Sequence, residues 1–421
     1  MVEGWRLVDP GHLFGACSCW GAASHASDIN PWDGTDAFWR KMAEARRTGK
    51  FDEAYLQHWR DGYLGDRKAM NGGDRYALWN MSKLHGSDRK TVFYTNGQGV
   101  SFFTPEGRTF ADEWYRHAFF PNHAFTFASR RDYDLDPVDS YLDFAAWWWR
   151  KMLDSGACDR LYWDCCFLQS SFNLVGTAAY VREDGEIQPS AYIFQMREQV
   201  KRAAVMMTEL GYDNRFNWIH MTNAGMAPIS AFGGIHYDWE DAADLTTFQE
   251  RYTRECIQVA TTGRAFGVIP VIMGYFSKTT PEKLKWLFRT GTGVCLTHEL
   301  DWSRFSEPWR QIKKALVEWG YGKPEVEVYN YWDDETYPVA ITGAETSSLA
   351  MCDRAKRRAI VIVSDWSGKD GRVTVRPDAA ALGLSAGFTA RDFESGAELP
   401  VADGALGLDL GKYDFRVVEF R

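Results

Sequence analysis

The sequence predicts a (β/α)₈ barrel followed by an antiparallel β-sandwich, and three observations support this fold class. Short β-branched or aromatic runs alternate with longer segments of helical period, as in repeated βα units around a parallel sheet. Eight such runs precede residue 322, which fits the size of an eight-stranded barrel. After residue 322 the pattern changes to period-two strands with tight turns. We therefore expect a barrel domain over residues 1–322 and a sandwich domain over residues 323–421.

The expected barrel strands are apolar or aromatic runs of five to nine residues. They are residues 13–19, 91–95, 124–128, 160–166, 216–222, 233–240, 268–276 and 292–300. The expected helices between them include residues 138–154, 190–210, 245–260, 281–289 and 307–319. In the second of these, apolar residues recur every three or four positions, which is typical of a helix with one buried side. That stripe consists of Ile193, Met196, Val200, Ala203 and Met207.

The last hundred residues read as strands joined by hairpin turns. Residues 368–371 (GKDG) and 394–397 (ESGA) have the glycine and polar residues that such turns favour. We expect each of them to connect two adjacent antiparallel strands.

Composition excludes several classes of function. Lys+Arg 48 against Asp+Glu 57 gives a net charge of −9, and no basic run is interleaved with aromatics, so we expect no nucleic-acid partner. No stretch of 18 apolar residues occurs, so we expect no membrane span. The first residues lack a basic start and a continuous apolar segment, which favours a cytoplasmic protein unless a signal peptide has been removed. The sequence leaves the oligomeric state open.

Catalytic groups of a barrel lie at the carboxyl ends of its strands. The run 160–166 ends in Leu161-Tyr162-Trp163-Asp164-Cys165-Cys166, which places one acid in otherwise apolar and aromatic sequence. A buried carboxylate is costly unless it is paired or used. Asp164 is therefore the first candidate catalytic residue, and a salt-bridged structural acid is the alternative.

The run 233–240 carries a second set of candidates. His236, Asp238 and Glu240 are spaced by two, so an extended strand projects all three from one face. An acid among aromatic rings at the barrel mouth would have a raised pKa, which suits a general acid near neutral pH. The alternative is that these acids only begin the next helix.

Two carboxylates on either side of a sugar are what glycoside hydrolysis requires. We therefore expect a glycoside hydrolase in which Asp164 is the nucleophile or stabilises charge, and Glu240 or Asp238 is the acid/base. An acid pair on strands four and six resembles the arrangement of retaining α-galactosidase-like and α-glucosidase-like barrels, so retention is the expected outcome.

Several motifs also resemble glycoside hydrolase family 123-like proteins. They are residues 91–114 (TVFYTNGQGVSFFTPEGRTFADEW), 161–189, the pair Arg197 and Glu198, residues 219–232 (IHMTNAGMAPISAF) and the closing GKYDFRVVEF. The resemblance covers about residues 90 to 421 and implies a barrel with a β-sandwich. That family uses an adjacent Asp-Glu pair with the acetamido group of an N-acetylgalactosaminide. Here Asp164 is followed by Cys165, so this mechanism and this substrate do not carry over.

A glycan substrate would be held by stacking and hydrogen bonds. Sugar faces pack on aromatic rings, and hydroxyls need donors and acceptors around them. Arg130 is a candidate for an acidic substituent, with an ordinary loop charge as the alternative. The candidate binding residues near strand ends are Trp163, His220, His236, Trp239, Tyr275, His298 and Trp302.

Two other functions stay open. The histidines, with Glu299 and Asp301, could hold a divalent metal in an amidohydrolase-like hydrolase, although the first run lacks the H-x-H pair of such barrels. A non-catalytic carbohydrate-binding protein would keep the aromatic residues without hydrolysis. For the glycosidase we expect no cofactor and no metal. Neither the sugar, its linkage, nor exo against endo action follows from the sequence.

Overall fold

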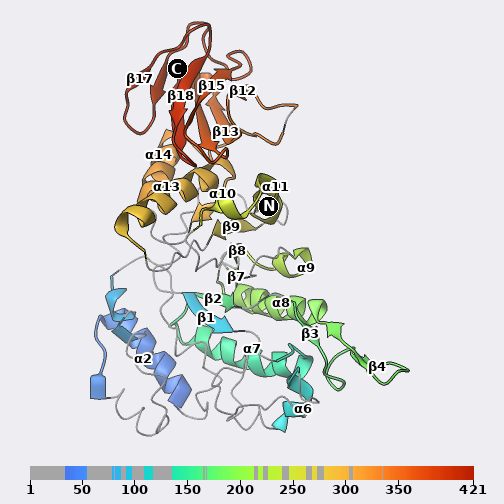
Figure 1. Cartoon of the computed structure of the whole chain (residues 1–421). Coiled ribbons are helices and arrows are strands. Elements are labelled where there is room, and N and C mark those ends of the chain that lie inside the picture. Colours follow the sequence, from blue (N-terminus) through green and yellow to red (C-terminus); the bar gives the residue numbers. More distant parts are fainter. Residues whose placement is uncertain are drawn as a thin grey trace. The chain divides into compact units, whose positions relative to one another are not determined.

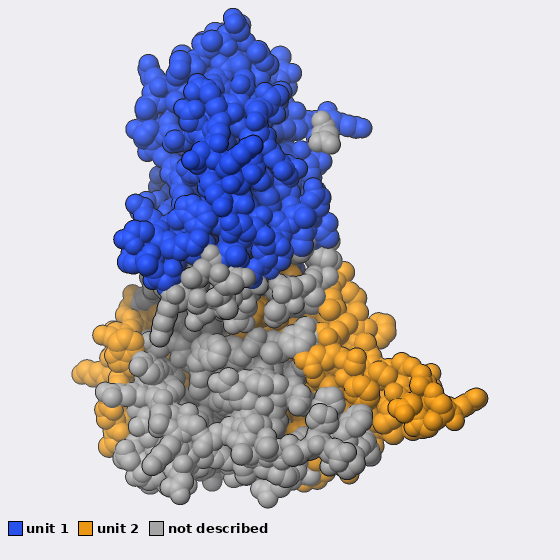
Figure 2. Space-filling view, in the orientation of Figure 1, with its two compact units in different colours: residues 1–10, 238–421 blue, residues 11–237 orange. Residues whose placement is uncertain are grey.

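A computed structural model of the chain describes most residues after position 134 and shorter segments before it. The described residues are 34–54, 78–79, 81–86, 92–96, 109–116, 135–164, 166, 168–212, 217–220, 226–238, 246–261, 268–272, 279–302, 307–333 and 335–421. The chain divides into two compact units, residues 11–237 and residues 238–421 with the first ten residues (Figure 2). The predicted domain boundary at residue 322 stays a prediction.

The first unit contains a parallel sheet (Figure 1). Its strands are β1 (Val92–Asn96), β2 (Arg160–Asp164), β7 (Trp218–His220) and β8 (Ile235–Asp238), and they are neighbours in that order. Parallel strands need a crossover between them, and helices supply it here. The strands expected over 91–95, 160–166, 216–222 and 233–240 are confirmed, whereas 13–19 and 124–128 lie outside the described residues.

Two long helices cover one face of this sheet. Helix α7 (Asp139–Asp154) precedes β2 and α8 (Ile193–Glu209) precedes β7, as the sequence predicts. Their apolar sides share a core with the strand residues Leu161, Trp163 and Ile219. In α8 the buried side is formed by Met196, Val200, Ala203 and Met207, the stripe expected from the spacing. The described residues of this unit also form α2 (Gly34–Thr48), α6 (Ala111–Trp114) and α9 (Ala227–Ser230).

An insertion between β2 and α8 forms two short antiparallel strand pairs, one enclosed by the other. Strands β3 (Ser170–Ser171) and β6 (Ser190–Ala191) pair at its base, and β4 (Tyr180–Val181) and β5 (Ile187–Gln188) pair further out. Figure 1 shows that the outer hairpin projects from the rest of the unit.

The second unit contains the parallel strand pair β9 (Ile269–Ile272) and β10 (Asp301–Trp302). The helices described in this unit are α10 (Phe248–Arg251), α11 (Arg254–Thr261), α13 (Pro281–Thr297) and α14 (Glu307–Trp319). Strand β9 and helix α14 confirm the predicted segments. Among the residues that the structure describes, no helix is long and apolar enough to cross a membrane. Nor do the described strands form a closed barrel, so barrel closure stays a proposal.

The strand predicted over residues 292–300 is wrong, because most of this segment belongs to α13. The helix starts at the N-cap Thr280, whose hydroxyl accepts a hydrogen bond from the Lys283 N–H, with Pro281 at its first position. From Thr290 to Thr297 it is buried on all sides. A short apolar run that is wholly buried has no periodicity to separate strand from helix.

The C-terminal strands form two antiparallel sheets. One has the order β11-β13-β14-β19-β16-β17 and the other β12-β15-β18. The strands are β11 (Glu327–Asn330), β12 (Val339–Thr342), β13 (Thr346–Asp353), β14 (Arg358–Asp365), β15 (Gly371–Pro377), β16 (Ala390–Asp392), β17 (Glu398–Leu399), β18 (Leu406–Leu410) and β19 (Phe415–Phe420). A short 3₁₀ turn, Arg354–Lys356, joins β13 to β14.

Only one of the two predicted hairpin turns is confirmed. The ESGA turn joins β16 to β17, which pair with Ala390 opposite Leu399. The GKDG prediction is wrong, because β14 pairs with β13 and β19 whereas β15 pairs with β12 and β18. Residues 368–371 therefore cross between sheets. The larger sheet is buried on both faces, with Ile360 and Ile362 of β14 in one core and Val361 and Val363 in the other.

Helix α13 approaches β10 closely at Gly291. A Cβ atom built there would lie 2.2 Å from the indole of Trp302, which is itself packed between Phe248 and Phe288. Replacing a helical glycine by alanine usually stabilises a protein by about 1 kcal/mol. Gly291→Ala should instead destabilise the chain by about 1–3 kcal/mol, because the indole has no space to move into.

Urea unfolding of Gly291→Ala and of Gly387→Ala tests this contact. Gly387 has open space around its Cβ position, so the control should unfold like the parent chain. Equal or greater stability of Gly291→Ala would contradict the close contact with Trp302.

Candidate active site

The carboxyl ends of three neighbouring strands bring polar residues to one level of the sheet. In the β1–β2 pair Asn96 is opposite Asp164, and in the β2–β7 pair Trp163 is opposite Ile219. The next residue along β7 is His220, whose carbonyl oxygen accepts a hydrogen bond from the Cys166 N–H at 3.0 Å. Asn96, Asp164 and His220 therefore end adjacent parallel strands at the same edge of the sheet, where barrel enzymes have their catalytic groups.

Next to this edge, one face of the sheet carries a cluster of aromatic rings. The hydroxyl of Tyr162 is hydrogen-bonded to Nδ1 of His220 at 2.6 Å. The ring of Tyr237, opposite His220 in the β7–β8 register, lies 5.4 Å from the imidazole and 5.8 Å from Tyr162. Trp218 packs edge-on against Tyr237 at 5.4 Å. We call Tyr162, Trp218, His220 and Tyr237 the aromatic face, and the contact of His220 with a substrate stays a prediction.

Trp163 lies on the opposite face, towards the helices, and differs from the expectation of an open stacking platform. Its side chain is fully buried, its ring meets Trp149 of α7 edge-on at 4.4 Å, and its indole N–H donates to Oδ1 of Asn217 at 2.9 Å. Because neighbouring strand residues alternate between faces, Trp163 and Tyr162 have different roles. His236 shares the register of Ile219, a residue of the helix-facing core, and is buried as well.

His298 is the C-cap of α13 in the second unit and does not end a strand. Its Nδ1 lies 2.9 Å from the carbonyl oxygen of Val294, so this nitrogen must carry the proton. Its Nε2 then accepts from the hydroxyl of Tyr331 at 3.0 Å. Both ring nitrogens are thus engaged within the protein, and Trp332 stacks on the ring at 5.9 Å. This is a structural histidine, in contrast to the predicted contact with substrate.

Trp302 also differs from the expected stacking residue. It is buried in β10 between Phe248 and Phe288 and belongs to the core of the second unit. Trp302 follows residues 292–300, the segment that was predicted as a strand and lies mostly in α13.

The remaining candidates are placed only in part. The backbones of Asp164 and Asp238 end β2 and β8, but their side chains are not among those described. Trp239, Glu240, Tyr275 and Arg130 lie outside the described residues. The sequence reasoning missed Tyr162 and Tyr237 as partners of His220, although the position of Tyr162 two residues before Asp164 was the signal that could have found it.

No group of three potential metal ligands occurs among the side chains that the structure describes. Glu299, proposed above for a metal, accepts a hydrogen bond from Tyr321 at 2.8 Å, and Asp301 pairs with Lys313 at 3.0 Å.

Comparison with known proteins gives similarity of structure only. No protein-family model and no curated protein sequence matches this chain, so the resemblance to family 123-like proteins stays a prediction. A GH27 β-L-arabinopyranosidase from Geobacillus stearothermophilus is similar, with a TM-score of 0.45, 13% identity, and 81% of this chain and 75% of that chain covered.

Two further solved structures show the same level of similarity. A noncanonic maltogenic alpha-amylase from Thermotoga neapolitana has a TM-score of 0.43 at 11% identity, over 96% of this chain and 97% of that chain. A GH36 alpha-galactosidase from Geobacillus stearothermophilus has a TM-score of 0.41 at 10% identity, over 95% of this chain and 55% of that chain. None of these similarities assigns residues or a substrate to this chain.

The neutral state of His298 predicts a pH dependence of stability. Burial is the main cause that lowers the pKa of His298 to about 4, from an ordinary value of 6.5. Between these two pH values the unfolded chain binds a proton here and the folded chain does not. Stability from this group should be complete above pH 6.5 and should fall by about 3 kcal/mol as the pH drops to 4.

The measurement is the free energy of unfolding between pH 7 and pH 4 for the parent chain and for His298→Gln. The variant is less stable at neutral pH but lacks this titration, so its curve should be flatter. Parallel curves for the two proteins would show that His298 titrates normally.

Proposed function

We propose that the chain is a glycoside hydrolase whose active site lies at the carboxyl edge of the β1-β2-β7-β8 sheet. The observation that carries the proposal is the register that aligns Asp164 with Asn96 and places it beside His220. One acid, one amide and one imidazole on adjacent strand ends suit a ligand rich in hydroxyl groups.

Alternation along β2 supports an inward position for Asp164. Asp164 is two residues after Tyr162 in β2, so the alternation of the strand assigns it to the same face as Tyr162, whose ring lies on the aromatic face with His220. The helices pack on the other face, where Trp163 lies. In a (β/α)₈ barrel the face away from the helices is the interior, so we propose that these strands are part of such a barrel with Asp164 at its mouth.

The hydrogen bond between Tyr162 and His220 would orient both groups beneath a bound sugar. We propose that Asp164 attacks the anomeric carbon, or stabilises its positive charge, and that His220 and Asn96 contact sugar hydroxyls.

The second carboxylate is proposed to come from the end of β8. Asp238 is two residues after His236, which is in register with Ile219 of the helix-facing core, so the alternation of β8 assigns Asp238 to the face towards the helices. Glu240 lies beyond the last residue of the strand and is not bound by this alternation. Glu240 is therefore favoured as the acid/base and Asp238 is the second candidate. With carboxylates about 5 Å apart the reaction would retain configuration, and with about 6.5–9.5 Å it would invert.

The first test is Asp164→Asn, assayed on a panel of oligosaccharides and aryl glycosides with product analysis. Hydrolysis should fall by about 10³-fold or more, because the amide is neither a nucleophile nor a negative charge. The fold should persist, as judged by circular dichroism and unfolding. Asp143→Asn is the matched control, since the Asp143 side chain is 76% exposed on α7 and, among the described residues, pairs with Arg202.

Near-normal turnover by Asp164→Asn would exclude the proposed role. The same panel separates the other two functions. Activity that disappears with a chelator and returns with added metal would indicate a metal-dependent hydrolase, and binding of a glycan without products would indicate a carbohydrate-binding protein.

The second test compares Glu240→Gln with Asp238→Asn on aryl glycosides of different leaving-group pKa. Loss of a general acid slows cleavage by about 10²–10⁴-fold for a poor leaving group and much less for a good one. We expect this dependence for Glu240→Gln and a uniform effect for Asp238→Asn. The reverse pattern would assign the acid to Asp238.

A further inference from the structure

The insertion after β2 and the start of α8 expose several large apolar side chains, two of them in the outer hairpin. Val175, Tyr180 and Val181 are 60%, 57% and 54% exposed, and Phe194 at the start of α8 is 71% exposed. Soluble proteins expose large apolar side chains singly, and a concentrated group usually marks an interaction surface. Figure 1 shows that this hairpin projects from the unit, so its two sides are open.

The base of the insertion is held by a buried polar network. Arg116, fully buried, donates to Asp136 at 3.2 Å and to the hydroxyl of Tyr192 at 2.9 Å, and Ser171 donates to the other oxygen of Asp136. Asn173 donates to three carbonyl oxygens, the longest at 3.1 Å. A satisfied buried network of this kind fixes one geometry. The hairpin therefore starts from a rigid base.

The tip of the hairpin, residues 182–186, is acidic. It has three carboxylates against one guanidinium, and that guanidinium, on Arg182, pairs with Asp184 at 2.7 Å. Glu183 and Glu186 are exposed, and neither has a basic partner among the residues that the structure describes.

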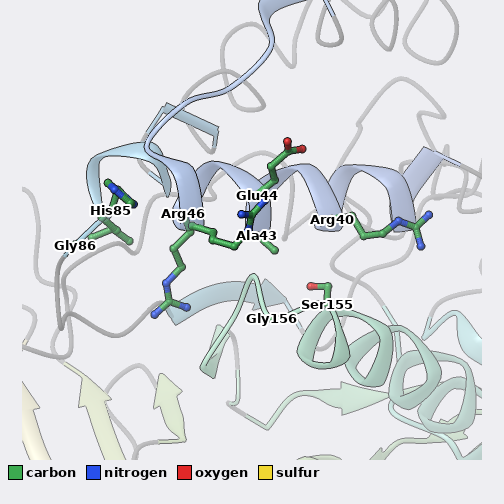
Figure 3. Close-up of a pocket in the computed structure, with 10 residues that line it drawn as sticks. Arg40, Ala43, Glu44, Arg46, His85, Gly86, Ser155 and Gly156 are labelled. Atoms are coloured by element: carbon green, nitrogen blue, oxygen red, sulfur yellow. The ribbon is translucent and has the colours of Figure 1, made fainter.

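A basic groove lies elsewhere in the same unit, between α2 and the turn that follows α7. It has a volume of about 790 Å³ and is lined by Arg40, Arg46, Arg47 and His85, with Ser155 on its other side (Figure 3).

Within the part of the chain that the structure describes, two of the three arginines in the groove, Arg40 and Arg47, are not paired with an acid, whereas the third is. Arg46 pairs with Asp159 at 2.7 Å. Arg40 and Arg47 have no acidic partner among the described side chains. The lining acid, Glu44, is bound by Lys41 at 3.1 Å, and its carboxylate points away from the Ser155 turn in Figure 3. The groove therefore presents positive charge.

We propose that two copies of this chain associate by exchanging these elements, the acidic tip of each hairpin entering the basic groove of the other. Helix α2 and the β4 hairpin stand at opposite sides of the unit in Figure 1, so a hairpin cannot reach its own groove. Exchange about a twofold axis forms two identical contacts and closes the assembly as a dimer. This inference does not depend on the proposed glycosidase activity.

The chemistry of the two surfaces is complementary. Glu183 and Glu186 would meet Arg40 and Arg47, and guanidinium–carboxylate pairs give both strength and orientation. Tyr180 and Val181 would be covered as the tip enters. Because exposed charges are screened over about 8 Å at physiological salt, the association should weaken as salt is added.

The test is sedimentation velocity of the full chain over a range of concentrations, with two charge-reversal variants. We expect the parent chain to form dimers. Glu183→Lys with Glu186→Lys should raise the dissociation constant by about tenfold or more, and so should Arg40→Glu with Arg47→Glu, because like charges then meet. Glu325→Lys, an exposed acid in the other unit, is the control and should dimerise normally.

The decisive arm is an equimolar mixture of the two variants. In a mixed dimer the reversed tip meets the reversed groove and the parent tip meets the parent groove, so the mixture should dimerise more tightly than either variant alone. A parent chain that stays monomeric at every concentration would overturn the proposal. So would charge reversals without effect, a mixture that stays monomeric, or growth beyond the dimer.

Discussion

The packing of α7 and α8 against β2 and β7 is the constraint on which the candidate site depends. Trp163 and Ile219 face those helices, and Trp163 is fixed twice, by its edge-on contact with Trp149 and by its hydrogen bond to Asn217. Because successive side chains of a strand point to opposite faces of the sheet, Tyr162 and His220 lie on the face away from the helices. The core on one side therefore determines which polar groups gather on the other, without any direct contact between the two sets.

The packing of the helices determines on which face of the sheet a side chain lies, and the pairing of the parallel strands determines its position along the strand. Register fixes how far along its strand each residue lies, and here it brings Asn96, Asp164 and His220 to one level. Register therefore aligns the backbone of Asp164 with the strand end that carries His220, whose imidazole is hydrogen-bonded to Tyr162. Three strands of three to five residues each are sufficient to build this arrangement.

Prediction from sequence succeeded where periodicity and helix signals agreed. Helices α7, α8 and α14 have one apolar side, and their bounds nearly coincide with the expected ones. It failed where a segment is buried on every side. Residues 292–297 continue a helix instead of forming a strand, and β14 contributes Ile360 and Val361 to different cores, so its turn could not be recognised as a crossing between sheets. In both cases the hydrophobic pattern lacks the polar positions that would reveal the geometry.

The lack of polar positions in the hydrophobic pattern also explains why the sequence could not separate the candidate site residues from packing residues. Closeness to a strand end identified Trp163, His220 and Asp164 alike, but only alternation separates a packing residue from one that faces a ligand. The run Leu161-Tyr162-Trp163 is apolar or aromatic at every position, so its sequence does not tell which parity faces the helices. Trp149 settles it, because an indole from α7 at 4.4 Å fills the space beside Trp163. The side chain of Tyr162 then lies on the other face of the strand, where its hydroxyl is hydrogen-bonded to His220. Tyr162 therefore belongs to the aromatic face. An aromatic residue at a strand end is thus informative about sugar binding only after its neighbours on the next helix are known.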